Sequence, residues 1–329
     1  MKFPRTTSQR FYDIRRSFVF LAIALLSSCL IIACQGDSAS RSDRVQSPSD
    51  CRQMSHALGQ VCVPQAPEAV ITLEEITFAD AIALGISPIG TATYEDVSID
   101  YLKDAYSSPP ISVGKSEQAN LETILSLKPD LIAGIVFSGE AVFKQLSQIA
   151  PTALGSWVGY SSWREYFDFV AQTLGRENEA AVVWDDYAQH ISDLKTALSK
   201  QVKDKKLTLI YSYGNGMTID AENSFIGSIF ADLDLSQPDY PPTEDGTITL
   251  SEELMPTIDA DILFVSQYNN AESEATWTEW QKKPLWQQLK AVKAGQVYTV
   301  DADIWRGGNP IAAEQVLDEL FEYLVKESA

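Results

Sequence analysis

Two segments of the chain, one in each half, share the same pattern of residues. In the first, Glu122 precedes the short apolar segment TILSLKP and then Asp130, which opens the run DLIAGIV. In the second, Glu253 precedes LMPTIDA and then Asp261, which opens DILFVSQ at the same distance from its glutamate. Two further pairs of segments match in the same order. Because chance explains one match better than three in order, we predict a duplicated chain with two lobes of like topology.

Short apolar strands alternate with helices in the first half of the chain. We expect strands and helices, in order along the chain, at 69–73, 77–85, 86–94, 120–129 and 130–138. The pattern restarts at residue 206 in the second half. This alternation predicts parallel sheets, and such sheets bind ligands at the carboxyl ends of their strands. The polar residues Ser138, Gly139 and Glu140 are expected at one of these strand ends.

A long helical stretch separates the two halves. Residues 176–202 contain no glycine or proline, which predicts a helix longer than those of a small strand–helix–strand unit, although a surface helix fits the same letters. We therefore predict an α/β protein with two Rossmann-like lobes, joined by one long helix, with a ligand cleft between the lobes. The predicted boundaries are 67–175 for the first lobe, 176–203 for the connecting helix and 204–329 for the second lobe.

The N-terminal residues are typical of an exported lipoprotein. A basic segment precedes the apolar run FVFLAIALLSSCLIIAC, so residues 1–33 are predicted to be a signal peptide. Residues 30–34 resemble the bacterial lipobox, which implies cleavage before Cys34 and lipidation of its sulfur; an uncleaved anchor is the alternative. Arg15-Arg16 partly matches a twin-arginine signal, so the export route stays open. Residues 34–66 are predicted to form a tether and a disulfide loop.

Composition restricts the classes of function further. Cys51 and Cys62 remain after the signal and lipid-site cysteines are assigned, and in an exported protein they are expected to form a disulfide. The only histidines, His56 and His190, lie in no metal-binding motif, so we expect no metal site. The formal charge of −20 makes nucleic acid an unlikely partner. Because the sequence has no phosphate-binding loop or nucleophile motif, we expect a binding protein rather than an enzyme.

Several segments resemble the siderophore-type substrate-binding proteins of ABC importers, in which a rigid helix joins the lobes. The resemblance rests mainly on VGKSEQANLETILSLKPDLIAG and PLWQQLKAVKAGQVYTVDADIW, and extends from about residue 51 to residue 324. It implies a monomeric lipoprotein, in the periplasm or on the outer face of the cytoplasmic membrane. It also implies that Glu122 and Glu253 dock on the two subunits of a membrane permease, with Glu252 as a rival to Glu253. The alternative for both glutamates is a favourable position at a helix start.

The predicted cleft is lined by loops at strand ends. The candidate ligand-binding residues are Tyr94, Lys115, Ser116, Ser138, Tyr213, Asn215, Tyr240, Tyr268, Trp305 and Arg306. Arg306 is the first choice, because a guanidinium can bind two oxygens around ferric iron. Hydroxamate binders of this class often have an arginine where this chain has Lys115-Ser116-Glu117.

The cargo is expected to be a ferric siderophore of the hydroxamate or mixed citrate–hydroxamate type. Its iron would be held by the chelator, so no resident cofactor is expected. Haem, with Tyr94 as an axial ligand, and cobalamin are the alternative cargoes.

Overall fold

The computed structural model describes residues 51–94, 97–198, 202, 204–213, 216–268 and 270–326. The predicted signal peptide, Cys34 and the tether lie outside these residues, as does Asn215. The side chain of Tyr213 is not described either. Within the described part of the chain, no helix is long and apolar enough to cross a membrane.

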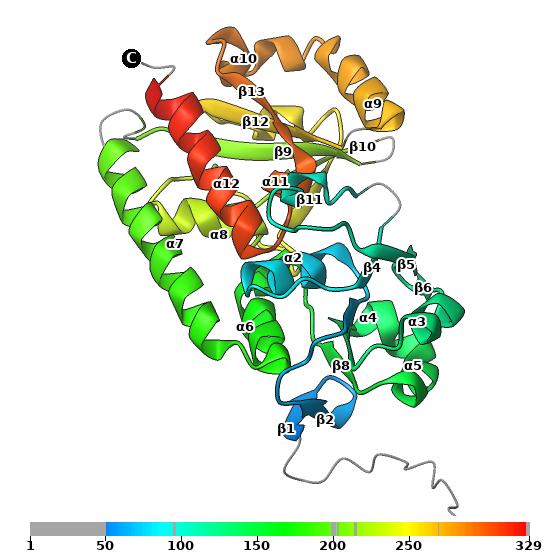
Figure 1. Cartoon of the computed structure of the whole chain (residues 1–329). Helices are drawn as coiled ribbons and strands as arrows, with labels where there is room; N and C mark the ends of the chain where they lie inside the picture. Colours follow the sequence, from blue (N-terminus) through cyan, green and yellow to red (C-terminus); the bar gives the residue numbers. More distant parts are fainter. Residues whose placement is uncertain are drawn as a thin grey trace, which may run out of the picture. The chain divides into compact units, whose positions relative to one another are not determined.

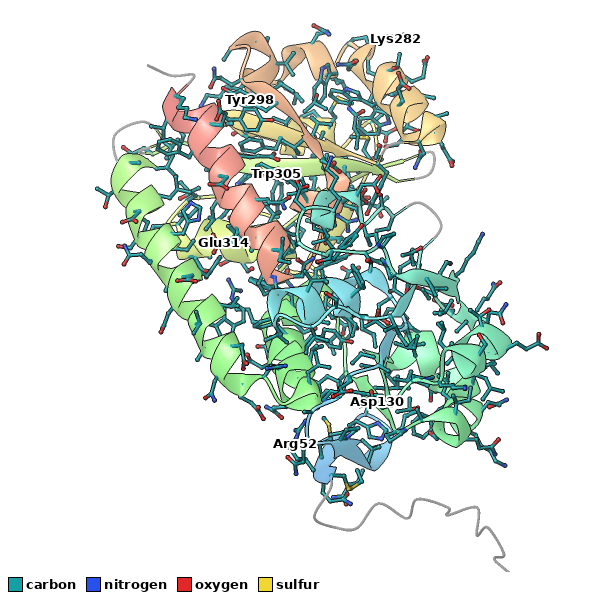
Figure 2. All side chains as sticks on the ribbon, in the orientation of Figure 1. Arg52, Asp130, Lys282, Tyr298, Trp305 and Glu314 are labelled. Carbon is teal, nitrogen blue, oxygen red and sulfur yellow. A yellow bond between two sulfur atoms is a disulfide. The ribbon has the colours of Figure 1, made fainter. Side chains whose placement is uncertain are left out.

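A disulfide-linked hairpin precedes the first lobe. Its two antiparallel strands are β1 (Cys51–His56) and β2 (Gly59–Pro64). A disulfide joins Cys51 to Cys62 with 5.5 Å between their Cα atoms, which confirms the predicted pairing. Arg52, labelled in Figure 2, donates hydrogen bonds to the carbonyl oxygens of Gln172 (2.6 Å) and Thr173 (3.1 Å). These carbonyls end a helix of the first lobe, so the arginine fastens the hairpin to that lobe.

The first lobe is built on a six-stranded sheet with strand order β6-β5-β4-β3-β7-β8. Every neighbouring pair is parallel except β5 and β6. The strands are β3 (Val70–Thr72), β4 (Gly90–Thr93), β5 (Ile111–Lys115), β6 (Gln118–Ala119), β7 (Leu131–Ile135) and β8 (Thr152–Gly155). The helices are α2 (Glu75–Ala83), α3 (Leu121–Leu127), α4 (Val136–Gly139), α5 (Phe143–Ile149) and α6 (Trp163–Leu174).

The strand predicted at 130–138 is shorter than expected. It ends at Ile135, and the polar tip forms the single helical turn α4 instead of extended chain. The five residues of β7 are all buried, whereas Phe137 in α4 is 40% exposed. The chain therefore leaves the sheet by a turn that brings Phe137 to the surface and keeps Ser138 buried.

The second lobe has a five-stranded sheet with strand order β11-β10-β9-β12-β13. Its strands are β9 (Leu207–Tyr213), β10 (Gly216–Asp220), β11 (Thr247–Leu250), β12 (Ile262–Gln267) and β13 (Val297–Asp301). The helices of this half are α8 (Phe225–Asp232), α9 (Ala271–Gln281), α10 (Lys290–Lys293), α11 (Ala302–Trp305) and α12 (Pro310–Phe321).

The topology of the second lobe differs from that of the first at β10. This strand pairs antiparallel with β9, with Tyr213 opposite Gly216, and was not predicted. The two residues between this pair are Gly-Asn in the sequence, which is also a signal for a tight hairpin, so the signal was present but was not used. The prediction of an α/β protein with two lobes is confirmed, but the two sheets are not copies.

The duplicated aspartates have the same structural role in both lobes. Asp130 accepts hydrogen bonds from the backbone N–H groups of Glu68 (2.8 Å) and Ala69 (3.0 Å), just before β3. Asp261 accepts one from the N–H of Lys206 (2.9 Å), just before β9. Each aspartate thus fixes the start of its lobe's first strand beside the strand that it precedes, β7 or β12. The repeated pattern therefore includes a structural component that is independent of ligand.

The helix between the lobes packs against both of them. α7 (Glu177–Leu198) contacts α6 and α12, as Figure 1 shows. Its residue Ala180 is part of the core of the first lobe. Ile191, Leu194 and Leu198 are part of the core of the second lobe. Because one helix contributes to both cores, a change in the angle between the lobes would disturb its packing.

A second connection lies beside this helix. Trp163, at the start of α6, is fully buried and donates a hydrogen bond from Nε1 to Ser228 Oγ in α8 (3.0 Å). The adjacent Arg164 forms an ion pair with Asp232, at the end of α8 (2.5 Å). Tyr187 of α7 also donates to Asp232 (2.7 Å). Helices α6, α7 and α8 are therefore linked across the boundary between the lobes.

Candidate functional site

The carboxyl ends of the parallel strands in the first lobe bring several predicted residues to one edge. Tyr94 follows β4, Lys115 and Ser116 lie at the end of β5, and Ser138 follows β7. The Ser116 hydroxyl donates to the carbonyl oxygen of Leu73 (3.2 Å), so it fixes the loop after β3. Lys115 is exposed at the same edge. The structure therefore places these four residues at the carboxyl ends of β4, β5 and β7, with β3 between β4 and β7.

Phe137 belongs to this edge and was missed by the sequence analysis. Its ring lies beside that of half-buried Tyr94, with 6.4 Å between the centroids. The exposed ring of Phe137 leaves apolar surface in contact with water. A cargo molecule that covered this surface would remove it from water, so Phe137 is a candidate contact for cargo. Its position after β7 could have indicated an exposed ring, but the longer strand that was predicted placed Phe137 within the sheet.

Buried carboxyl groups lie behind this edge. Glu74 accepts a hydrogen bond from the backbone N–H of Ile135 (3.2 Å), and contacts Thr77 and the Tyr166 hydroxyl. Glu75, only 7% exposed, accepts one from the N–H of Tyr94 (3.2 Å). Burial, together with the charges of Glu74 and Asp303, raises the pKa of Glu75 to about 7. Burial also raises the pKa of Glu74.

Arg306 lies in the second lobe and is held by its neighbours. Its Nε lies 3.1 Å from Asp220 Oδ2, and its Nη1 donates to the Tyr268 hydroxyl (2.7 Å). The guanidinium carbon is 3.6 Å from the Tyr211 ring centroid and 5.1 Å from that of Tyr160. Only 9% of the arginine side chain is exposed. The Arg306 guanidinium was expected to be free to bind cargo oxygens. Instead it bonds to Asp220 and Tyr268 and lies near the aromatic rings of Tyr211 and Tyr160.

Trp305, although adjacent in sequence, does not face the cleft. It is fully buried, with its ring centroid 4.4 Å from that of Phe264. Its Nε1 donates to Glu319 Oε2 (2.7 Å), which satisfies its one polar group. In this structure Trp305 therefore packs in the core of the second lobe, whereas it was predicted among the residues that line the cleft. The one-turn helix α11, where a loop was expected, turns Trp305 into the core of the second lobe.

Tyr240 lies in a different region from the other candidates. Its hydroxyl is 2.9 Å from the Thr208 hydroxyl, and its side chain lines a groove of about 960 Å³ with Lys206 and Pro241. None of the other predicted ligand residues whose side chains the structure describes lines this groove. Tyr240 is therefore not grouped with Arg306 and Tyr268.

The two lobes meet around a small cavity of about 10 Å³. The first lobe contributes Glu75, Ile76, Val97, Tyr101 and Tyr160, and the second contributes Tyr268, Ala302, Asp303, Arg306 and Gly307. Hydrogen bonds cross beside it, from Ser98 N–H to Asp303 Oδ2 (3.3 Å) and from Asn309 Nδ2 to the Tyr101 hydroxyl (2.8 Å).

The carboxylate of Asp303 lies in an unfavourable electrostatic environment at this cavity. Its Oδ1 is buried and accepts no hydrogen bond from the described residues. Burial raises the pKa of Asp303 to about 7, and Asp301 adds to the shift. Neither Glu75 nor Asp303 was selected from the sequence, because a single carboxylate near a strand end is common and has no distinctive spacing. Across the described ranges, no group of three or more histidine, cysteine, aspartate or glutamate side chains could hold a metal ion.

The predicted docking glutamates are both exposed. Glu122 lies in the first turn of α3, which Asn120 caps by accepting a hydrogen bond from Thr123 N–H (3.0 Å). Glu253 precedes a short 3-10 turn, Met255–Thr257, with Pro256 in its first turn, where the missing N–H of proline has no helical partner to lose. The neighbouring Glu252 forms a salt bridge with Lys283 (2.6 Å), whereas Glu253 forms none within the described part of the chain.

Comparisons with known proteins agree with this two-lobed arrangement. A family model described as "Periplasmic binding protein" matches residues 70–304. The chain belongs to the periplasmic binding protein family. It is 32% identical to "Probable siderophore-binding lipoprotein YfiY" of Bacillus subtilis (strain 168), over 94% of this chain and 97% of the relative. It is also 32% identical to "Fe(3+)-citrate-binding protein YfmC" of the same organism, over 90% of this chain and 95% of that relative.

A solved structure of this type superimposes well on the chain. Staphylococcus aureus SirA, crystallised in complex with staphyloferrin B, gives a TM-score of 0.71 at 27% identity. The match covers 83% of this chain and 98% of SirA. These findings confirm the resemblance to substrate-binding proteins of iron-complex importers. As a periplasmic binding protein, the chain is a transport component outside the cytoplasm and not an enzyme.

Proposed function

We propose that the protein captures a ferric siderophore of the hydroxamate or mixed citrate–hydroxamate type between its lobes. The observation that carries the proposal is the convergence of aromatic and polar side chains at the lobe boundary in a chain of this family. Tyr101 and Tyr160 come from one lobe and Tyr268 and Arg306 from the other, and Tyr94 adjoins them through its bond to Glu75. Flat aromatic faces suit a bulky, partly apolar chelate, and the likeness to the ferric-citrate binder YfmC supports an iron complex.

Delivery to an ABC permease dimer is the second part of the proposal. Glu122 and Glu253 are exposed and occupy matching positions in the two halves of the chain. The engagement of Glu252 by Lys283 supports Glu253 as the docking residue. Exposed ion pairs are individually weak, so two of them suit reversible and oriented contact.

Membrane attachment completes the proposed arrangement. We propose lipidation at Cys34 after removal of residues 1–33, with the following tether and disulfide hairpin carrying a monomeric two-lobed domain. We also propose the boundaries 67–175 for the first lobe, 176–203 for the connecting helix and 204–329 for the second lobe. Attachment by a lipid would keep the binding protein near its permease and raise the effective concentration of the pair.

Haem and cobalamin remain the cargoes against which the proposal must be tested. Tyr94 would have to lose its proton to ligate haem iron, yet burial raises its pKa, and the charge of Glu75 raises it further. This opposes a phenolate ligand in the protein without cargo.

A fluorescence-quenching panel tests the proposed function directly. Purified protein would be titrated with ferric hydroxamate, ferric citrate, ferric catecholate, haemin and cobalamin. Quenching by the ferric hydroxamate or a mixed chelate, without a shift of the haemin Soret band when the protein is added, is the expected result. A shifted and sharpened Soret band that reverts to that of free haemin in Tyr94→Phe would overturn the siderophore assignment in favour of haem.

A further inference from the structure

The cavity between the lobes has an unusual balance of charge. It is lined by one arginine, Arg306, and by two carboxylates, Glu75 from the first lobe and Asp303 from the second. Arg306 is already paired with Asp220, which is buried with it. The remaining charge at the cavity is therefore that of the two carboxylates, which face each other across the lobe boundary. An anionic group of a cargo molecule would meet repulsion here.

One of the two carboxylates, Asp303, also has an unused acceptor oxygen. Asp303 Oδ1 is buried without a partner among the described residues, while its Oδ2 accepts only the 3.3 Å bond from Ser98 N–H. Glu75 is almost fully buried and accepts from Tyr94 N–H through Oε2. A buried acceptor without a donor costs free energy, and a charge-assisted donor would recover most of it. The site therefore favours a ligand group that is rich in N–H donors.

The dimensions of the cavity restrict what that group can be. A volume of about 10 Å³ is close to the space that one water molecule needs. An ammonium head is of similar size, whereas an iron centre with its chelating groups is far larger. The chelate would have to lie outside the cavity, against Tyr94 and Phe137 at the adjoining strand ends, and send only a small group inward.

We propose that Glu75 and Asp303 select the charge class of the cargo by binding a pendant ammonium group of a ferric hydroxamate. This inference rests on the proposed function and narrows it to chelates that are neutral or cationic at this end. The tyrosines around the cavity, Tyr101, Tyr160 and Tyr268, present aromatic faces and hydroxyls that also suit an ammonium.

A series of chelates with one iron core tests the selection. Ferrioxamine B carries a terminal ammonium, its N-acetyl derivative is neutral, and its N-succinyl derivative is anionic. At pH 8, tryptophan quenching should give an affinity for ferrioxamine B about tenfold above that for the N-acetyl form. The N-succinyl form should bind more weakly than both.

Two variants connect this preference to the named carboxylates. Glu75→Gln with Asp303→Asn should bind ferrioxamine B and its N-acetyl form equally, with the affinity for the N-acetyl form retained. The matched control Glu177→Gln removes an exposed carboxylate in the first turn of α7 that does not line the cavity, and should keep the wild-type preference. Thermal melts of each variant would establish that it is folded.

The outcomes separate the inference from the proposed function. Equal binding of the three chelates, or a preference for the anionic form, would overturn the charge selection and leave siderophore binding intact. A preference that survives in the double variant would overturn the role of these two residues. Quenching by no ferric chelate of any class would overturn the proposed function and the inference together.

Discussion

At the scale of single residues, adjacent positions in one motif have unrelated roles. Trp305 and Arg306 were both expected at the cargo, yet one packs in the core and the other is held by Asp220 and Tyr268. Sequence shows which side chains are bulky or charged, but the direction of each depends on the single turn α11. The carboxylates Glu75 and Asp303 escaped prediction because their importance arises only when the two lobes meet.

The raised pKa of Glu75 predicts a dependence of stability on pH. Its folded-state pKa of about 7 lies above the ordinary glutamate pKa of 4.5, so the folded protein holds a proton that the unfolded chain releases. The free energy of unfolding should therefore fall as pH rises from about 4.5 through about 7, with a contribution from this group on the order of 3 kcal/mol. Chemical denaturation at pH 5.5 and pH 8 would measure the difference.

The variant Glu75→Gln supplies the control for this pH dependence. It removes the titrating group while keeping the shape of the side chain, so its free energy of unfolding should change less between the two pH values. An identical pH dependence in wild type and variant would show that Glu75 is not responsible.

At the scale of elements, the repeated pattern correctly indicated two lobes, while pairing between strands could not be obtained from it. Asp130 and Asp261 fix the first strand of each lobe, which explains why that part of the pattern recurs. The antiparallel β10 was not predicted, because the apolar run that begins at residue 206 was compared with the start of the first lobe as one continuous segment. Hydrophobic pattern defines a strand's faces, but its partners depend on long-range contacts.

Removing these aspartates should destabilise both lobes. Asp130→Ala leaves two backbone N–H groups without their acceptor, and Asp261→Ala leaves one. Because these bonds are exposed or half-buried, each variant should lower the free energy of unfolding by about 0.5–1.5 kcal/mol. Asp130→Asn keeps one acceptor oxygen and should cost less. Urea denaturation would measure all three.

An exposed neighbour provides the reference for these variants. Asp259→Ala removes a carboxylate that makes no described hydrogen bond and should change stability by less than about 0.5 kcal/mol. If Asp130→Ala and Asp261→Ala were as mild as this reference, the shared structural role of the two aspartates would be excluded.

At the scale of the whole molecule, cargo binding and delivery should be separable. Glu122 and Glu253 are exposed and do not line the cavity between the lobes. The double variant Glu122→Ala/Glu253→Ala should therefore bind the quenching chelate with unchanged affinity, while uptake of its labelled iron by cells falls by about tenfold or more.

The adjacent Glu252→Ala is the matched control for docking. Its carboxylate is paired with Lys283, so its loss should reduce uptake less than the loss of Glu253. Loss of chelate binding in the double variant would refute the docking assignment, and normal uptake would do so equally.

The links between α6, α7 and α8 have a consequence for how a partner could recognise a loaded molecule. Trp163 and Arg164 tie the lobes together beside the helix that already belongs to both cores. We therefore expect the separation between Glu122 and Glu253 to be nearly the same with and without cargo. A permease that contacted only these two residues would find them at the same separation in empty and loaded molecules. Empty molecules would then compete with loaded ones for the permease, and the import rate would depend on the fraction of this protein that is loaded.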